Sequence, residues 1–144
     1  MVCLGNICRS PLGEGILKSK VPEEKFLIDS AGTASYHIGS PPDIRSIKVA
    51  KDNNIDISKQ RARAFRSDDF QKFDIIYAMD SQNFNDLISM SKSEEEMLKV
   101  KLILENKNVP DPYYGDISDF KNVFKLLDKV CDQISRELLH EKKF

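Results

Sequence analysis

The chain has 144 residues, a length that suits one folded domain with its own core. Its composition is 40% hydrophobic and 31% charged, and its net charge of −1 lacks the basic excess typical of nucleic-acid-binding proteins. No apolar run is long enough to span a membrane, and the first ten residues do not resemble a secretory signal. We therefore expect a cytoplasmic single domain over residues 1–144, without nucleic-acid or membrane partners.

Apolar runs alternate with helical patterns along the chain, which favours an α/β fold with a small parallel sheet. Four strands are predicted, within residues 1–4, 26–29, 74–79 and 100–104. Four helices are predicted, at residues 11–21, 43–53, 81–89 (with Ser81 as the cap) and 118–140. The expected architecture is a four-stranded parallel sheet with helices on both faces and a phosphate-binding loop after the first strand.

The first predicted strand is unusually short, because only Met1 and Val2 precede Cys3. Strands usually have about five or six residues, so the first strand looks truncated. A shortened central strand would remove buried side chains worth roughly 1.5–3 kcal/mol each. The expectation is that the native product begins further upstream, or that this chain is a truncated form that folds weakly.

Three cysteines and two histidines form no recognisable metal-ligand pattern. Cys3 and Cys8 lie close in sequence, but zinc would need further ligands at typical spacings. Cys131 falls within an apolar helical pattern and is expected in the core. We predict free thiols in a reducing compartment, with no metal and no other cofactor.

Residues 3–11 read Cys-Leu-Gly-Asn-Ile-Cys-Arg-Ser-Pro, a pattern that suits a phosphate-binding loop. Gly5 is expected to let the backbone turn with its N–H groups facing inward, as in an anion-binding nest. Ser10 is a good N-cap and Pro11 suits the first helical position. The positive end of that helix would favour both a phosphate and a thiolate.

The residue types in this loop suggest distinct tasks. Cys3 is the candidate nucleophile, and the planar guanidinium of Arg9 can bind two phosphate oxygens. The Ser10 hydroxyl can donate a hydrogen bond to the sulfur, and Asn6 can brace the loop. A Cys-x5-Arg pair alone arises by chance in about one such chain in eight, so a buried strand cysteine before an ordinary capped helix remains the alternative.

Four segments resemble motifs of the low-molecular-weight protein tyrosine phosphatase family, and the resemblance extends over nearly the whole chain. The segments are residues 2–11, 29–33, 73–80 and 111–115. The resemblance implies that Cys3 attacks phosphorus, that Arg9 stabilises the transferred phosphoryl group, and that Asp111 acts as general acid and base. The remaining loop residues that would hold the phosphate are Leu4, Gly5, Asn6, Ile7, Cys8 and Ser10.

The resemblance also implies a substrate-binding rim and an aryl substrate. Tyr36, Tyr113 and Tyr114 match the aromatic walls around the entering ring, and a deep slot suits a phosphotyrosine-containing protein better than phosphoserine. Related protein-arginine phosphatases carry Thr where this chain has Ile7, so the isoleucine favours an aryl phosphate. From the residues alone, these tyrosines fit partly buried surface positions equally well, and Asp111 beside Pro112 fits a turn.

Further residues match supporting positions of the family. Ser30 and Asp80 resemble residues that brace the loops, and Gln60 aligns where the family usually has a loop-supporting histidine. Cys8 matches a cysteine that can pair with the nucleophile under oxidation, although simple packing is the alternative.

Three other functions compete with a tyrosine phosphatase. They are a protein-arginine phosphatase of the same fold, a catalytically weak phosphoprotein-binding module, and an arsenate reductase. An arsenate reductase needs further cysteines after the loop, and none lies between Cys8 and Cys131. We expect a monomer or weak dimer.

Overall fold

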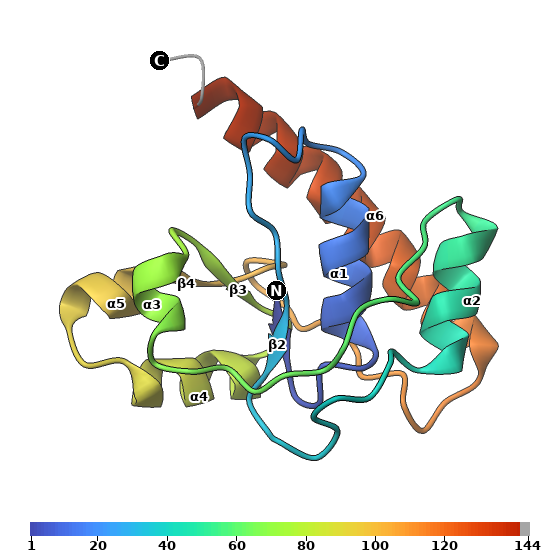
Figure 1. The fold of residues 1–144 in the computed structure, drawn as a ribbon, viewed down its shortest axis with the longest axis horizontal. Coiled ribbons are helices and arrows are strands. Elements are labelled where there is room, and N and C mark those ends of the chain that lie inside the picture. The colour runs from blue at the N-terminus through green and yellow to red at the C-terminus, as the bar shows by residue number, and fades with distance from the viewer. Residues whose placement is uncertain (142–144) are drawn as a thin grey trace.

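Four short parallel strands form the centre of the fold in the computed structural model, which describes residues 1–141 (Figure 1). Their spatial order is β2-β1-β3-β4, and the predicted four-stranded parallel sheet is confirmed. Val2 of β1 pairs with Ala31 on one side and with Ala78 on the other. The strands are β1 (Val2–Cys3), β2 (Ala31–Gly32), β3 (Ile76–Ala78) and β4 (Val100–Leu102).

Helices cover both faces of this sheet (Figure 1). One group consists of α1 (Arg9–Lys18), α2 (Ile44–Asp52) and the long α6 (Ile117–Glu141). The other group consists of α3 (Asp69–Lys72), α4 (Ser81–Met90) and α5 (Glu94–Leu98). Among residues 1–141, no helix is both long and apolar enough to cross a membrane.

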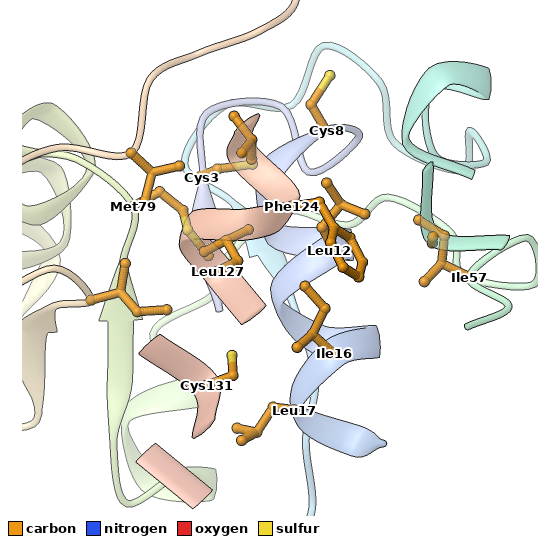
Figure 2. Close-up of a cluster of buried hydrophobic side chains, with 14 of the residues drawn as sticks. Cys3, Cys8, Leu12, Ile16, Leu17, Ile57, Met79, Phe124, Leu127 and Cys131 are labelled. Carbon is orange, nitrogen blue, oxygen red and sulfur yellow. The ribbon is translucent and has the colours of Figure 1, made fainter. Parts of the chain in front are cut away.

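Successive strand residues point to opposite faces and so feed two separate cores. Val2 and Ala78 belong to the core beneath α3 and α4. Cys3 and the next residue after β3, Met79, belong to the larger core between α1 and α6. Figure 2 shows the two helices packed through their side chains. Helix α1 contributes Leu12, Ile16 and Leu17, and α6 contributes Phe124, Leu127 and Cys131. The Cys3 side chain is therefore fixed by core packing from one side.

The predicted strand at residues 26–29 is wrong, because β2 begins only at Ala31. Strand pairing depends on a neighbouring backbone, and the β1–β2 register begins with Val2 opposite Ala31. An apolar run alone could not show where this pairing begins. The strands predicted at 74–79 and 100–104 exist but are shorter, at Ile76–Ala78 and Val100–Leu102.

Two helix starts also differ from the prediction. Ser10 does not cap α1, because the helix begins at Arg9 and its N-cap residue is Cys8. Pro11 still lies in the first turn, where a missing N–H breaks no helical hydrogen bond. Asp80 rather than Ser81 caps α4, since its carboxylate accepts from the Asn83 amide. Helices α3 and α5 were not predicted because four or five residues carry too little periodicity.

Candidate active site

Carbonyl groups of the loop after β1 accept hydrogen bonds from neighbouring segments. The Cys3 and Leu4 carbonyls accept from the amides of Thr33 and Ala34, and the Ile7 carbonyl accepts from the Asp43 amide. In the described part of the chain, no loop or cap hydrogen bond uses an N–H of residues 4–8. These amides and the N-terminus of α1 are therefore available to bind an anion.

The left-handed residue of this loop is Asn6, not the expected Gly5. Asn6 has φ 57°, a conformation that asparagine tolerates better than most residues. Its buried side-chain oxygen accepts from the Arg63 amide at 3.0 Å. Its side-chain nitrogen donates to Ser10 Oγ at 2.8 Å and to Ser30 Oγ at 2.9 Å. Asn6 thus joins the loop to Ser30 and to the backbone of Arg63.

The Asn6 amide sets the direction of the neighbouring hydrogen bonds. Since Ser10 Oγ accepts from Asn6, the hydroxyl proton is available to Cys3 Sγ, which lies 3.0 Å away. Ser30 Oγ likewise accepts from Asn6 and donates to Glu14 Oε1 at 2.7 Å. The Ser10 hydroxyl, instead of capping α1, is therefore placed to stabilise negative charge on the sulfur.

Arg9 is a buried cation held by the surrounding elements. Only 3% of Arg9 is exposed, and its Nη1 donates to Asp80 Oδ2 at 2.7 Å and to the Val109 carbonyl at 3.0 Å. Pairing with a carboxylate offsets the cost of burying the guanidinium. Every hydrogen bond that Arg9 makes to the described residues uses Nη1. The Nη2 edge of the fork makes no hydrogen bond to the described residues, so it can take phosphate oxygens.

Asp111 lies beside this guanidinium, 3.7 Å from its carboxylate oxygen Oδ2 to Arg9 Nη2. Its other oxygen accepts from the Tyr113 amide at 3.1 Å. The side chain is 44% exposed, so the carboxylate can exchange protons with water and with a ligand. The structure therefore places the guanidinium beside the carboxylate that the sequence singled out, and Arg9 lies at the start of the helix that follows the Cys3 loop.

Aromatic side chains gather next to the loop after β1. Tyr36 and Tyr114 are 76% and 95% exposed, and Tyr113 is partly covered. His37, which the sequence analysis did not consider, lies between two of them, with ring centroids 6.4 Å from Tyr36 and 6.5 Å from Tyr113. A Cβ on Gly5 would lie only 3.0 Å from this imidazole ring. The glycine thus allows His37 to pack directly on the phosphate-binding loop.

Gln60 lies outside the network around Asn6. Its Nε2 donates to the Pro11 carbonyl at 3.1 Å, so it contacts the first turn of α1 rather than the loop itself. Among residues 1–141, its buried Oε1 has no hydrogen-bond partner.

The two other thiols differ from a catalytic nucleophile. Burial raises the pKa of the Cys8 thiol far above its usual value, and the nearby Asp43 carboxylate adds to this effect. Burial also raises the pKa of Cys131 to about 12. Cys131 lies in the core between α1 and α6, as predicted (Figure 2). Among residues 1–141, no three His, Cys, Asp or Glu side chains are grouped to hold a metal ion.

Sequence reasoning missed a second set of polar residues around the loop: Glu14, His37, Asp43, Arg45 and Arg63. Glu14 could have been noticed as a charge between the two glycines of α1, where it is only 4% exposed. Arg63 pairs with Asp69, six residues away, at 3.0 Å and with the distant Asp29 at 3.2 Å. No local pattern announces such pairs.

Comparisons with known proteins agree with this geometry. The family model described as low molecular weight phosphotyrosine protein phosphatase matches residues 1–144. A Gallus gallus protein of that name is 39% identical over 140 residues, covering 90% of this chain and 88% of the relative. The crystal structure of an Entamoeba histolytica protein tyrosine phosphatase has a TM-score of 0.91 at 36% identity, covering 98% of this chain and 96% of that chain.

A more distant solved structure contains a ligand. Vibrio vulnificus Wzb in complex with benzylphosphonate has a TM-score of 0.86 at 30% identity, covering 94% of each chain. The fold, the matched family model and the relatives confirm the resemblance expected from the motifs. The chain belongs to the low molecular weight phosphotyrosine protein phosphatase family, a family of hydrolases with a cysteine-based mechanism.

Proposed function

We propose that this protein hydrolyses phosphotyrosine through a phosphocysteine intermediate on Cys3. One observation carries the proposal: the Cys3 sulfur, 3.0 Å from the Ser10 hydroxyl, lies on a loop whose amides make no loop or cap hydrogen bond to the described residues, and the Arg9 that follows lies 3.7 Å from Asp111. Nucleophile, oxyanion donors and acid thus share one site, which is the set that phosphoryl transfer requires.

In the first step the Cys3 thiolate attacks phosphorus and the bond between phosphorus and the phenolic oxygen breaks. Asp111 gives its proton to the departing phenolate, because an unprotonated phenolate is a costly leaving group. The free edge of Arg9 and the amides of residues 4–8, with the Ile7 and Cys8 backbone among them, hold the phosphoryl oxygens. The same binding serves the charge that develops in the transition state.

In the second step water attacks the phosphocysteine. Asp111 takes the proton from this water, the phosphorus–sulfur bond breaks, and phosphate forms. The Ser10 hydroxyl stabilises the departing Cys3 thiolate through the hydrogen bond already present at 3.0 Å. The site needs no proton carrier other than Asp111.

The rim supports an aryl substrate. Exposed rings of Tyr36 and Tyr113, with His37 between them, offer flat surfaces on which a phenyl ring can stack. The bound benzylphosphonate of the Vibrio vulnificus relative is an aromatic phosphonate, which agrees with this choice. We propose phosphotyrosine-containing proteins as substrates, with Tyr114 at the outer rim and Ile7 as an apolar wall. We further propose a single cytoplasmic domain that acts as a monomer or weak dimer.

The test is steady-state hydrolysis of phosphotyrosine, phosphoserine and phosphoarginine by the purified chain. Phosphotyrosine should be the best substrate, and Cys3→Ser should bind it without turnover. Asp111→Asn should lower kcat/KM for phosphotyrosine by about 100-fold or more, since general acid catalysis contributes that much. Asp52→Asn, an exposed carboxylate at the end of α2, serves as the matched control and should retain activity.

Two results would overturn the proposal. Preference for phosphoarginine would support a protein-arginine phosphatase and would contradict the role given to Ile7. Binding of phosphotyrosine without turnover by the unsubstituted chain would support a phosphoprotein-binding module.

A further inference from the structure

The segment that follows Asp111 accepts two hydrogen bonds from one side chain of another element, Arg45. Residues 111 and 113–116 are exposed. Before this segment, the Val109 amide donates to the Met79 carbonyl at 2.8 Å. After Asp111, Arg45 of α2 donates from Nη2 to the Tyr113 carbonyl at 2.9 Å and from Nη1 to the Gly115 carbonyl at 3.0 Å. Arg45 therefore fixes the far side of this segment.

Arg45 is itself held in place. Its Nε and Nη2 donate to the two carboxylate oxygens of Asp43, each at 3.0 Å. Its guanidinium lies over the ring of Phe120, 4.3 Å from the centroid, and 5.9 Å from the centroid of Tyr113. A planar group bound on two edges and one face has little freedom to move. The Tyr113 and Gly115 carbonyls that Arg45 binds are therefore also restricted in their movement.

The start of α2 also holds the phosphate-binding loop. The Asp43 amide donates to the Ile7 carbonyl at 2.8 Å, and the Ser46 hydroxyl donates to the Cys8 carbonyl at 3.2 Å. The Asp43 carboxylate meanwhile caps α2 through the Arg45 amide at 2.9 Å. The N-terminus of α2 thus binds the loop of the nucleophile on one side and the segment of the acid on the other.

We propose that Arg45 is a positioning residue, which sets the distance between the Asp111 carboxylate and the leaving-group oxygen held over Cys3. The inference rests on the proposed function, because it assigns to Arg45 a part in the acid step of that reaction. Without Arg45, residues 112–116 lose both carbonyl contacts, and Asp111 loses its fixed approach to the site. The thiol, Arg9 and the loop amides keep their own contacts, so attack by sulfur is preserved.

The test compares two aryl phosphates whose leaving groups differ in their need for a proton. With Arg45→Ala, kcat/KM for phosphotyrosine should fall about 10- to 100-fold, the loss typical of a misplaced catalytic group. For p-nitrophenyl phosphate the loss should be several-fold smaller, because p-nitrophenolate departs without protonation. Lys48→Ala, which removes an exposed cation from the same helix, is the matched control and should leave both values unchanged.

A double variant links the effect to Asp111. In an Asp111→Asn background, Arg45→Ala should cause little further loss on phosphotyrosine, because the group that it positions is already absent. Arg45→Lys, which keeps the charge beside Asp43 but cannot span both carbonyls, provides a second variant if Arg45→Ala folds poorly. It should show the same selective loss in a milder form.

The outcomes separate this inference from the proposed function. Turnover by the unsubstituted chain together with equal losses on both substrates would overturn the positioning role alone. A full additional loss in the Asp111→Asn background would do the same. No turnover of either aryl phosphate by the unsubstituted chain would overturn the proposed function and this inference with it.

Discussion

Asn6 sets the direction of the hydrogen bond between Ser10 and the Cys3 sulfur. Its amide can face only one way, because its oxygen accepts from the Arg63 amide at 3.0 Å. The two N–H groups must then point to Ser10 and Ser30, which turns the Ser10 proton toward Cys3. One left-handed residue therefore sets both the shape of the loop and the hydrogen bond to the nucleophile.

Removing the Ser10 hydroxyl tests this arrangement. A hydrogen bond to a charged group contributes about 1.5–3 kcal/mol, so Ser10→Ala should lower kcat by about 10- to 100-fold. The rate of Cys3 alkylation by iodoacetate should also fall, since the sulfur loses its hydrogen-bond donor. Ser118→Ala, near the start of α6, is a control on the exposed surface. Unchanged alkylation with lowered kcat would contradict a direct effect on the sulfur.

At the scale of elements, α2 combines three contacts at its first turn. Asp43 caps the helix, its amide binds the Ile7 carbonyl, and its carboxylate binds the Arg45 side chain. Burial alone would raise the pKa of the Asp43 carboxyl, but the hydrogen bonds from Arg45 outweigh it and hold this pKa below its usual value. The start of α2 is therefore stabilised by a charge that acid removes.

The lowered pKa of Asp43 predicts that the loss of stability caused by Asp43→Asn depends on pH. A carboxyl whose pKa is lower in the folded state stabilises the fold above its unfolded pKa of about 4 and loses this effect as pH falls through the folded pKa. Asparagine keeps the cap but not the charge, so Tm at pH 7 should fall by about 2–4 °C. Thermal melts at pH 7 and at about pH 2.5 should show the difference shrinking in acid. A difference that persists or grows in acid would refute this account.

At the scale of the whole molecule, two cores are separated by a sheet of very short strands. The larger core lies between α1 and α6 and includes Cys3, Leu12 and Leu127 (Figure 2). Strands of two or three residues provide few backbone hydrogen bonds, so side-chain packing on the two faces must contribute most of the stability.

Truncation of Leu127, which is fully buried on α6, measures that contribution. Leu127→Ala should lower the free energy of unfolding by about 2–5 kcal/mol, as expected for a cavity in a packed core. Urea denaturation gives the value, with Lys125→Ala on the exposed side of the same helix as the control. A loss below about 1 kcal/mol would show that the core relaxes around the cavity.

How much of this molecule the sequence could predict depends on whether the signal is local. The Cys3 to Arg9 spacing, the apolar pattern of α6 and the family motifs are local, and they predicted the fold, the loop and the residues that meet around Arg9. The residues at which a strand begins and ends depend on its pairing with a neighbouring strand. The apolar run at residues 26–29 therefore did not show that β2 begins only at Ala31. The contacts of Asp43 with Ile7, of Arg45 with Tyr113 and Gly115, and of Arg63 with Asp29 join segments far apart in the sequence, so no short window of sequence predicts them.

The two attachments of Arg9 Nη1 have a consequence for how this protein would respond to a bound oxyanion. One hydrogen bond reaches Asp80 at the start of α4, and the other reaches Val109 after β4. An oxyanion bound to the Nη2 edge of the guanidinium would restrain Arg9, and with it Asp80 and Val109. Slower amide hydrogen exchange should therefore extend into the first turn of α4, on the opposite face of the sheet from α1. Ligand occupancy could then be monitored at a site that the ligand never touches.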